Sequence, residues 1–123
     1  MDWAEPLPES CPPQDARNPN DMIVYRIIEG TSATENDFIS HRKKYPSKFF
    51  KDECIARSLS VFDDISACKM VLKLPNFRNS NIVKLTLDIQ SGVIKKTFKD
   101  KNHYSWWMAA EINPVNNCKL ISE

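Results

Sequence analysis

Two histidines and a small set of arginines, serines and carboxylates are the residues best suited to chemistry. His41 lies among lysines, whereas His103 opens an aromatic segment, so any histidine chemistry rests on His103. An imidazole titrates near neutral pH and can act as a general acid or base. Arg26 interrupts an apolar run, where a guanidinium either faces water or reaches a carboxylate or phosphate. His103 and Arg26 are therefore our first candidates for a site.

Common catalytic and metal motifs are absent from the sequence. Two glycines in 123 residues exclude a P-loop and a glycine-rich dinucleotide fingerprint. No G-x-S-x-G or H-E-x-x-H pattern occurs. The cysteines are scattered, without the close pairs typical of zinc sites. We therefore expect no metal, and reduced, mostly buried thiols at Cys11, Cys54, Cys68 and Cys118.

The composition is that of an ordinary globular domain. Hydrophobic residues make up 41% and charged residues 27%, with a net charge of +1. That balance gives no global field for nucleic acid or an anionic membrane. No apolar run approaches the ~20 residues that span a bilayer, and the first residues do not resemble a secretion signal. We expect a cytoplasmic protein with no membrane partner.

The elements that must position these residues indicate an α+β fold. Residues 81–89 and 93–98 alternate apolar and polar side chains, which predicts a hairpin around Gly92. Further strands are predicted at residues 22–28, 59–62 and 118–121, and helices at 34–45 and about 64–73. The order favours a mainly antiparallel sheet with two or three helices packed against it.

The chain divides into residues 1–21, a proline-rich extended arm, and residues 22–123, a single α+β domain. Residues 1–20 hold five of the eight prolines, which cannot join a central strand or a helix interior. Trp3 and Leu7 are too apolar for a purely solvated tail, so we expect the arm to lie extended across the domain.

Residues 42–51 form the only basic and aromatic cluster. Five cations alternate there with Tyr45, Phe49 and Phe50. Lysines and arginines contact phosphates, and aromatic rings stack on bases, so nucleic-acid binding is one hypothesis. Compensation of a helix dipole together with core phenylalanines explains the same residues.

Two resemblances involve most of the candidate residues. The opening residues 2–13, Tyr25-Arg26, residues 56–62 and residues 103–107 resemble a family of small, uncharacterised bacterial proteins. That resemblance implies a bacterial, stand-alone domain and brings no activity. A weaker one is the order of Arg26, the Ser58-x-Ser60 pair and Glu111, which is similar to ADP-ribosyltransferase-like domains.

The second resemblance implies roles for particular residues. Arg26 would hold the phosphates of NAD, and Ser60 would orient the site. His103 or Tyr104 would line the nicotinamide pocket, and Glu111 would stabilise the cationic transition state. The sequence departs from the family's Glu-x-Glu pair, because Ala109 stands two residues before Glu111.

Without a strong catalytic constellation, we first expect a protein-interaction module with an unidentified protein partner. Its binding residues would be Trp3, Arg57, Tyr104, Trp106 and Trp107. The alternative is an ADP-ribosyltransferase-like or small RNase-toxin-like enzyme that uses Arg26 and His103. Nucleic-acid binding through residues 42–51 is the third hypothesis. No cofactor is expected except NAD, under the transferase alternative.

Overall fold

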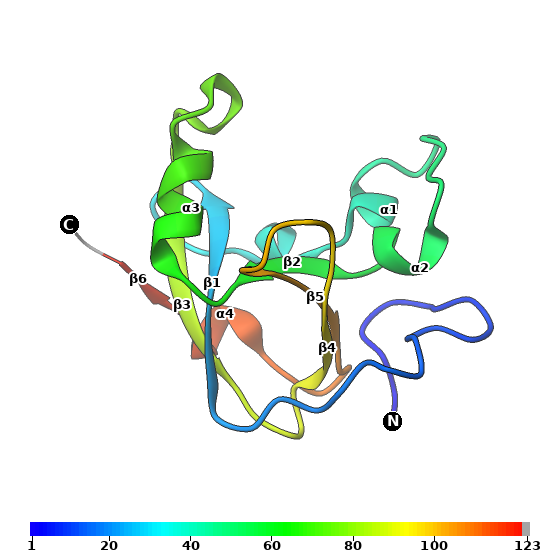
Figure 1. The fold of residues 1–123 in the computed structure, drawn as a ribbon. Coiled ribbons are helices and arrows are strands. Elements are labelled where there is room, and N and C mark those ends of the chain that lie inside the picture. Colours follow the sequence, from blue (N-terminus) through cyan, green and yellow to red (C-terminus); the bar gives the residue numbers. More distant parts are fainter. Residues whose placement is uncertain (122–123) are drawn as a thin grey trace.

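The computed structural model describes residues 1–121, in which a six-stranded antiparallel sheet is flanked by short helices (Figure 1). This arrangement confirms the α+β class and the mainly antiparallel sheet. The strands are β1 (Met22–Glu29), β2 (Leu59–Phe62), β3 (Ser80–Leu87), β4 (Gly92–Lys96), β5 (His103–Met108) and β6 (Lys119–Leu120). The helices are η1 (Glu35–Phe38), α1 (His41–Lys44), α2 (Glu53–Ala56), α3 (Ile65–Leu72), η2 (Pro75–Phe77) and α4 (Pro114–Asn117). None of the helices in this part of the chain has the length and hydrophobicity needed to cross a membrane.

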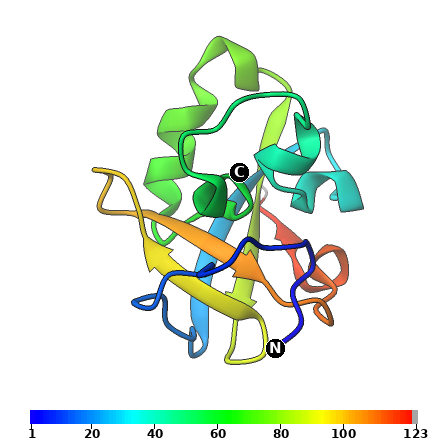
Figure 2. The same ribbon diagram turned by 90° about the vertical axis from the view of Figure 1, so that its right-hand side faces the viewer.

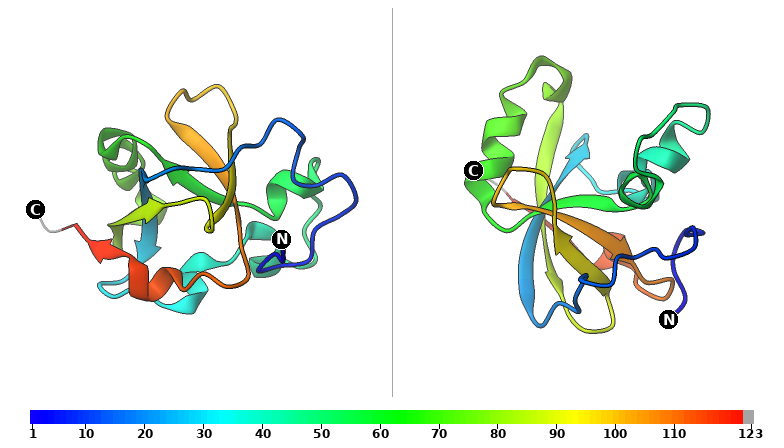
Figure 3. Two further views of the ribbon diagram at one scale, coloured as in Figure 1. Left: turned by 90° about the horizontal axis from the view of Figure 1, so that it is seen from below. Right: turned by 45° about the vertical axis from the view of Figure 1, so that its right-hand side comes forward.

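The sheet has the order β4-β5-β2-β1-β3-β6 and consists of two halves that meet between β1 and β2. β1 pairs with β3 along its whole length, from Met22 to Glu29, but it shares only the pair Tyr25↔Phe62 with β2. β2, β5 and β4 form the other half. The two halves run in clearly different directions in Figure 3. Arg26 and Ser60 therefore lie beside a junction between two well-paired ladders.

Alternating side chains divide the core into two parts on opposite faces of β1. Val24 and Ile28 belong to the larger part, which β2, β3, β4 and β5 also fill. Tyr25 and Ile27 face the smaller part, which lies under α3. The Asp64 carboxylate accepts a hydrogen bond from Ser66 N at 2.8 Å and so caps α3.

The predicted hairpin of residues 81–98 is wrong, although both of its strands form. β3 pairs with β1 and β6, whereas β4 pairs with β5. The loop between β3 and β4 is held by β5, since Trp106 Nε1 and Ala109 N both donate to Ser91 O at 3.0 Å. Gly92 has a φ of +125°, and a Cβ there would lie 2.0 Å from Trp107 O. Gly92 therefore allows close approach to β5 instead of forming a hairpin turn.

The single helix predicted over residues 34–45 is also wrong. It is split into η1 and α1 by Ile39, which is extended at φ −113° and ψ 151°. The next residue, Ser40, is 1% exposed, and its N and Oγ donate to the Glu5 carboxylate at 2.9 and 2.5 Å. Ser40 Oγ also accepts from Lys43 N and caps α1. The helix is interrupted where the N-terminal arm docks.

The N-terminal arm crosses β5 and β4, as Figure 2 shows, and it is fastened at several points. Trp3 bridges to Ala109, and Arg17 bridges to Ile94. A disulfide joins Cys11 to Cys54 of α2 across a separation of 43 residues. The expectation that all four thiols are reduced is therefore wrong for this pair, because the docked arm brings together cysteines that are far apart in sequence. Cys68 and Cys118 are free.

Candidate functional site

Arg26 points from β1 to the same side as the larger core, but its guanidinium binds two backbone carbonyls at the edge of that core. It follows Val24 in the alternation, and its guanidinium lies 5.7 Å from the centre of the Phe38 ring. Nε donates to Asp37 O at 2.8 Å and Nη1 donates to Ser60 O at 2.7 Å. Nη2 donates to no residue among 1–121, and no carboxylate in that range lies within 4.0 Å of the guanidinium. Burial lowers the pKa of Arg26 to about 10, with the Asp37 charge opposing the shift.

Ser60 and His103 are joined in a chain of hydrogen bonds that spans β2, β5 and the end of β4. The Ser60 hydroxyl lies 3.0 Å from His103 Nε2, and His103 Nδ1 lies 2.9 Å from Thr97 Oγ1. Thr97 Oγ1 is in turn 2.9 Å from the Ser105 hydroxyl. Burial lowers the pKa of His103 below its ordinary value, against smaller opposing effects of Asp100 and Thr97. A neutral imidazole can therefore accept the Ser60 proton at neutral pH.

A cleft of about 770 Å³ brings Arg26 and Ser60 to the same space. Its walls come from β2, from residues 50–56 and from α1, and Phe98 closes one side. Apolar side chains such as Ile39 and Ile55 lie between the polar groups. His103 itself is 7% exposed and reaches the cleft through Ser60. The cleft thus combines a guanidinium with a hydroxyl–imidazole pair in a partly apolar setting, which is typical of ligand sites.

The cleft also contains residues that the sequence interpretation did not select. His41 lines it, and burial together with the charges of Arg26, Lys44 and Lys48 lowers the His41 pKa. Phe98 is 71% exposed, has a φ of +62° and lies 4.9 Å from the His103 ring. The alternating pattern had placed Phe98 inside a strand, so the pattern gave no signal for its position at the cleft.

Glu53 supplies a carboxylate to the cleft wall. It lies in α2 and is bound by Arg42 and Arg57, whose hydrogen bonds and charges lower its pKa. Asp52 also lines the cleft and caps α2 through a bond from Ile55 N at 3.1 Å. Among residues 1–121, no three histidine, cysteine or acidic side chains gather in a way that could hold a metal ion.

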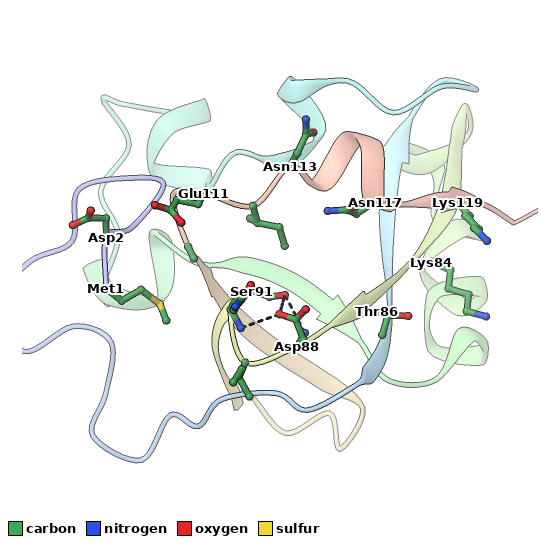
Figure 4. A pocket seen from close by; sticks show the side chains of 14 residues that line it. Met1, Asp2, Lys84, Thr86, Asp88, Ser91, Glu111, Asn113, Asn117 and Lys119 are labelled. Atoms are coloured by element: carbon green, nitrogen blue, oxygen red, sulfur yellow. Dashed lines mark hydrogen bonds between the residues drawn. The ribbon is translucent and has the colours of Figure 1, made fainter.

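Glu111 does not line the cleft that contains Arg26. It lines a different hollow of about 1080 Å³ together with Met1, Asp2, Asp88 and Lys84. Figure 4 shows Glu111 beside Asp2 at one end of that hollow, while Lys84 and Lys119 lie at the other end. The chain continues past β5 before it reaches Glu111, so the order of residues in the sequence did not indicate a shared site.

The aromatic segment that follows His103 belongs to the core, an alternative to a binding surface that the sequence leaves open. Trp106 is 0% and Trp107 1% exposed, and Tyr104 is also buried. Trp107 Nε1 donates to Cys54 O at 2.9 Å, which ties β5 to α2. These three rings fill the space between the sheet and its neighbours and offer no surface to a partner.

Trp3 and Arg57 hold the arm in place. The half-buried Trp3 packs beside Arg57, Leu59 and Trp107 around a very small gap. Arg57 Nη1 donates to Pro6 O at 2.6 Å, and Arg57 Nε donates to Glu53 at 3.3 Å. Neither residue reaches the cleft that contains Arg26.

Comparison with protein-family models, curated proteins and solved structures found no match to this chain. The resemblance to small bacterial proteins and the similarity to ADP-ribosyltransferase-like domains therefore remain predictions from the sequence. The geometry of the cleft has to carry any functional proposal.

Proposed function

We propose that the cleft beside Arg26 binds NAD⁺ and that the protein is an ADP-ribosyltransferase-like enzyme. One observation carries the proposal. Arg26 and Ser60, from two different strands, line one cleft, and His103 from a third strand lies behind it, hydrogen-bonded to the Ser60 hydroxyl. Chance resemblance in sequence order gives no reason for such residues to meet in space.

Arg26 suits a phosphate ligand because its charge has no carboxylate partner at contact distance within residues 1–121. Two of its nitrogens are fixed by the carbonyls of Asp37 and Ser60, which holds the guanidinium plane still. Nη2 remains to donate to a phosphate oxygen. Arg26 is half-buried and interacts with the Asp37 charge beyond contact distance, so a phosphate would supply a close anionic partner.

Ser60 and His103 would act on the ribose side of the substrate. In the proposed reaction the bond between ribose C1′ and the nicotinamide nitrogen breaks, and a bond from C1′ to an acceptor oxygen or nitrogen forms. Nicotinamide leaves with the bonding electron pair, and the acceptor loses one proton. The neutral His103–Ser60 pair can orient the sugar or take up that proton. Glu111 has no role here; the carboxylates that line the cleft are Asp52, which caps α2, and Glu53, which Arg42 and Arg57 bind.

A thermal-shift titration tests the binding step. Ligand at about a hundred times its dissociation constant stabilises the native state by ~2.7 kcal/mol, which raises the Tm of a domain of this size by on the order of 10 °C. We expect NAD⁺ and ADP-ribose to raise the Tm, because both carry the pyrophosphate, and nicotinamide alone to leave it unchanged. Release of nicotinamide from NAD⁺, measured by chromatography, tests the reaction.

Arg26→Lys is the informative variant. It keeps the positive charge but removes the planar guanidinium, whose nitrogens would bind two carbonyls and a phosphate. It should lose most of the shift with NAD⁺. Arg78→Lys, at an exposed arginine after η2, is the matched control and should keep it. Ser60→Ala at an exposed strand position should retain binding and lose nicotinamide release. An absent shift in the wild type, or an equal shift in Arg26→Lys, overturns the proposal.

The protein-interaction role stays a prediction without a supporting surface. Three of its five binding residues are buried, and Trp3 and Arg57 fasten the arm. Cytoplasmic placement likewise stays a prediction. The Cys11–Cys54 disulfide argues against it, since disulfides persist mainly in oxidising compartments.

A further inference from the structure

We propose that residues 43–51, here called the rim loop, dock single-stranded nucleic acid and present it as the acceptor for the cleft. The acceptor role rests on the proposed transferase function, whereas the docking role rests on the rim loop alone. The rim loop joins α1 to α2 and turns at residues 45–48, where Lys48 N donates to Tyr45 O at 3.1 Å. The proposal depends on its unpaired cations, its exposed rings and its place beside the cleft.

The cations around the rim loop divide into those paired with a carboxylate and those without one, although Lys48 also lies 5.5 Å from the centre of the Phe50 ring. Arg42, just before it, is structural, because it binds Glu53 and the Pro46 carbonyl and stacks 4.7 Å over Phe50. Lys44 lies 3.3 Å from Glu29. Within residues 1–121, no carboxylate lies within 4.0 Å of Lys43, Lys48 or Lys51, and all three are exposed. Three ammonium groups are thus left to neutralise phosphates, and none is needed to hold the fold through an ion pair.

Two aromatic rings of the rim loop face solvent. Phe49 is 86% exposed and Tyr45 is 46% exposed. Lys44 and Lys48 lie 5.6 and 5.7 Å from the centre of the Tyr45 ring, which places positive charge beside an accessible ring face. An exposed ring among cations is the combination on which unpaired bases stack while their phosphates are neutralised. A duplex would keep its bases stacked inside and would leave Phe49 without a partner.

The rim loop is continuous with the cleft. Phe50 and Lys51 line the cleft wall, directly after the exposed Phe49. A strand held on Phe49 and Lys48 would therefore approach the cleft that Arg26 and Ser60 line. An acidic peptide could also meet the lysines, but it would gain little from Phe49. The exposed rings favour nucleic acid over an acidic protein.

Fluorescence anisotropy with a labelled oligouridylate of about 12 nucleotides tests docking, because this length covers one ordinary single-strand site. We expect binding by the full chain that weakens steeply between about 50 and 200 mM salt. Lys43→Ala with Lys48→Ala should lower the salt slope by about 1.4, since each phosphate contact on a single strand contributes ~0.7. Phe49→Ala should weaken binding about five-fold or more with little change in that slope, because base stacking is not ionic.

Lys73→Ala with Arg78→Ala is the matched control, because it removes two exposed positive charges near η2. In Figure 1 this segment lies beyond α3 on the left of the view, whereas α1 and α2 lie on the right. It should bind RNA as the wild type does. A polyglutamate peptide of the same charge should bind much more weakly than the RNA. Absent RNA binding, an equal loss in the control, equal binding of polyglutamate, or no effect of Phe49→Ala each overturns the proposal.

The NAD⁺ titration separates this inference from the transferase proposal. The rim-loop variants should keep the NAD⁺ shift, because neither Lys43 nor Lys48 lines the cleft. RNA binding without any NAD⁺ shift supports docking by the rim loop and removes its role as an acceptor surface. An NAD⁺ shift without RNA binding overturns the inference and leaves the transferase proposal intact.

Discussion

At the scale of single residues, backbone and burial constraints determine which groups can act. Arg26 and His103 are both shifted towards their neutral forms by burial, and each is held by two oxygen atoms. Burial favours the neutral form of Cys68 as well, but for a thiol this removes reactivity. Burial, with a smaller effect of Asp64, raises its pKa to about 12, so this thiol stays protonated and inert. The polar groups best placed to react are therefore Arg26, Ser60 and His103, at the junction of the two sheet halves.

Gly92→Ala should destabilise the protein strongly. The new Cβ would meet the Trp107 carbonyl at 2.0 Å, and φ is +125°, so both contact and backbone strain oppose the substitution. We expect a loss of about 3 kcal/mol or more. Gly30→Ala is the control, because φ there is +74° but no atom lies within 4 Å; it should cost only ~1 kcal/mol. Urea denaturation measures both, and equal losses would show that φ alone matters.

At the scale of elements, the N-terminal arm is what organises the site. Glu5 binds Ser40, the N-cap of α1, the Pro6 carbonyl accepts from Arg57, and Cys11 is bonded to Cys54 of α2. Both short helices that border the cleft therefore depend on the arm for their position. Four-residue helices have little stability of their own, because the first turn costs more entropy than one hydrogen bond returns.

Reduction should therefore loosen the arm and α2 together. Closing a loop of 43 residues constrains the unfolded chain, and opening it costs about 2–4 kcal/mol. We expect dithiothreitol to lower the Tm of the wild type and of Cys118→Ser equally, because Cys118 is a free thiol. Cys11→Ser with Cys54→Ser should begin at the lower Tm and show no response to reductant. A wild type insensitive to full reduction would show that the non-covalent contacts of the arm suffice.

At the scale of the whole molecule, local sequence patterns predicted where strands form better than they predicted which strands pair. The alternation of residues 81–98 predicted both strands. The hydrophobic period does not identify the neighbour of a strand, however, and β4 pairs with β5 instead of β3. The rings of Tyr104, Trp106 and Trp107 are compatible with either a core or a binding surface, and long-range packing places them in the core. Arg26, Ser60 and His103 were chosen by residue type and order. Phe98, His41 and the disulfide needed contacts that only the folded chain makes.

Acid should lower the stability of the fold, because burial lowers the pKa values of both His41 and His103. In the unfolded chain they titrate near 6.5. Between that pH and their lower folded values the unfolded state binds more protons. Stability is therefore greatest above 6.5 and falls as the pH falls through this window, by at most ~1.4 kcal/mol per pH unit for each histidine. His41 is exposed, so solvent screening leaves it the smaller share.

Denaturation in urea at several pH values from neutral to mildly acidic measures this loss. His103→Gln keeps a polar partner for Ser60 and removes the titration, so its stability should be flatter across the window than that of the wild type. His41→Gln should flatten the profile less. A further decline should begin only below the ordinary glutamate pKa of 4.5, since Arg42 and Arg57 hold the pKa of Glu53 below it. If both histidine variants follow the wild-type profile, the imidazoles are solvated in the folded protein, and the hydrogen-bonded Ser60–His103 pair is not maintained in solution.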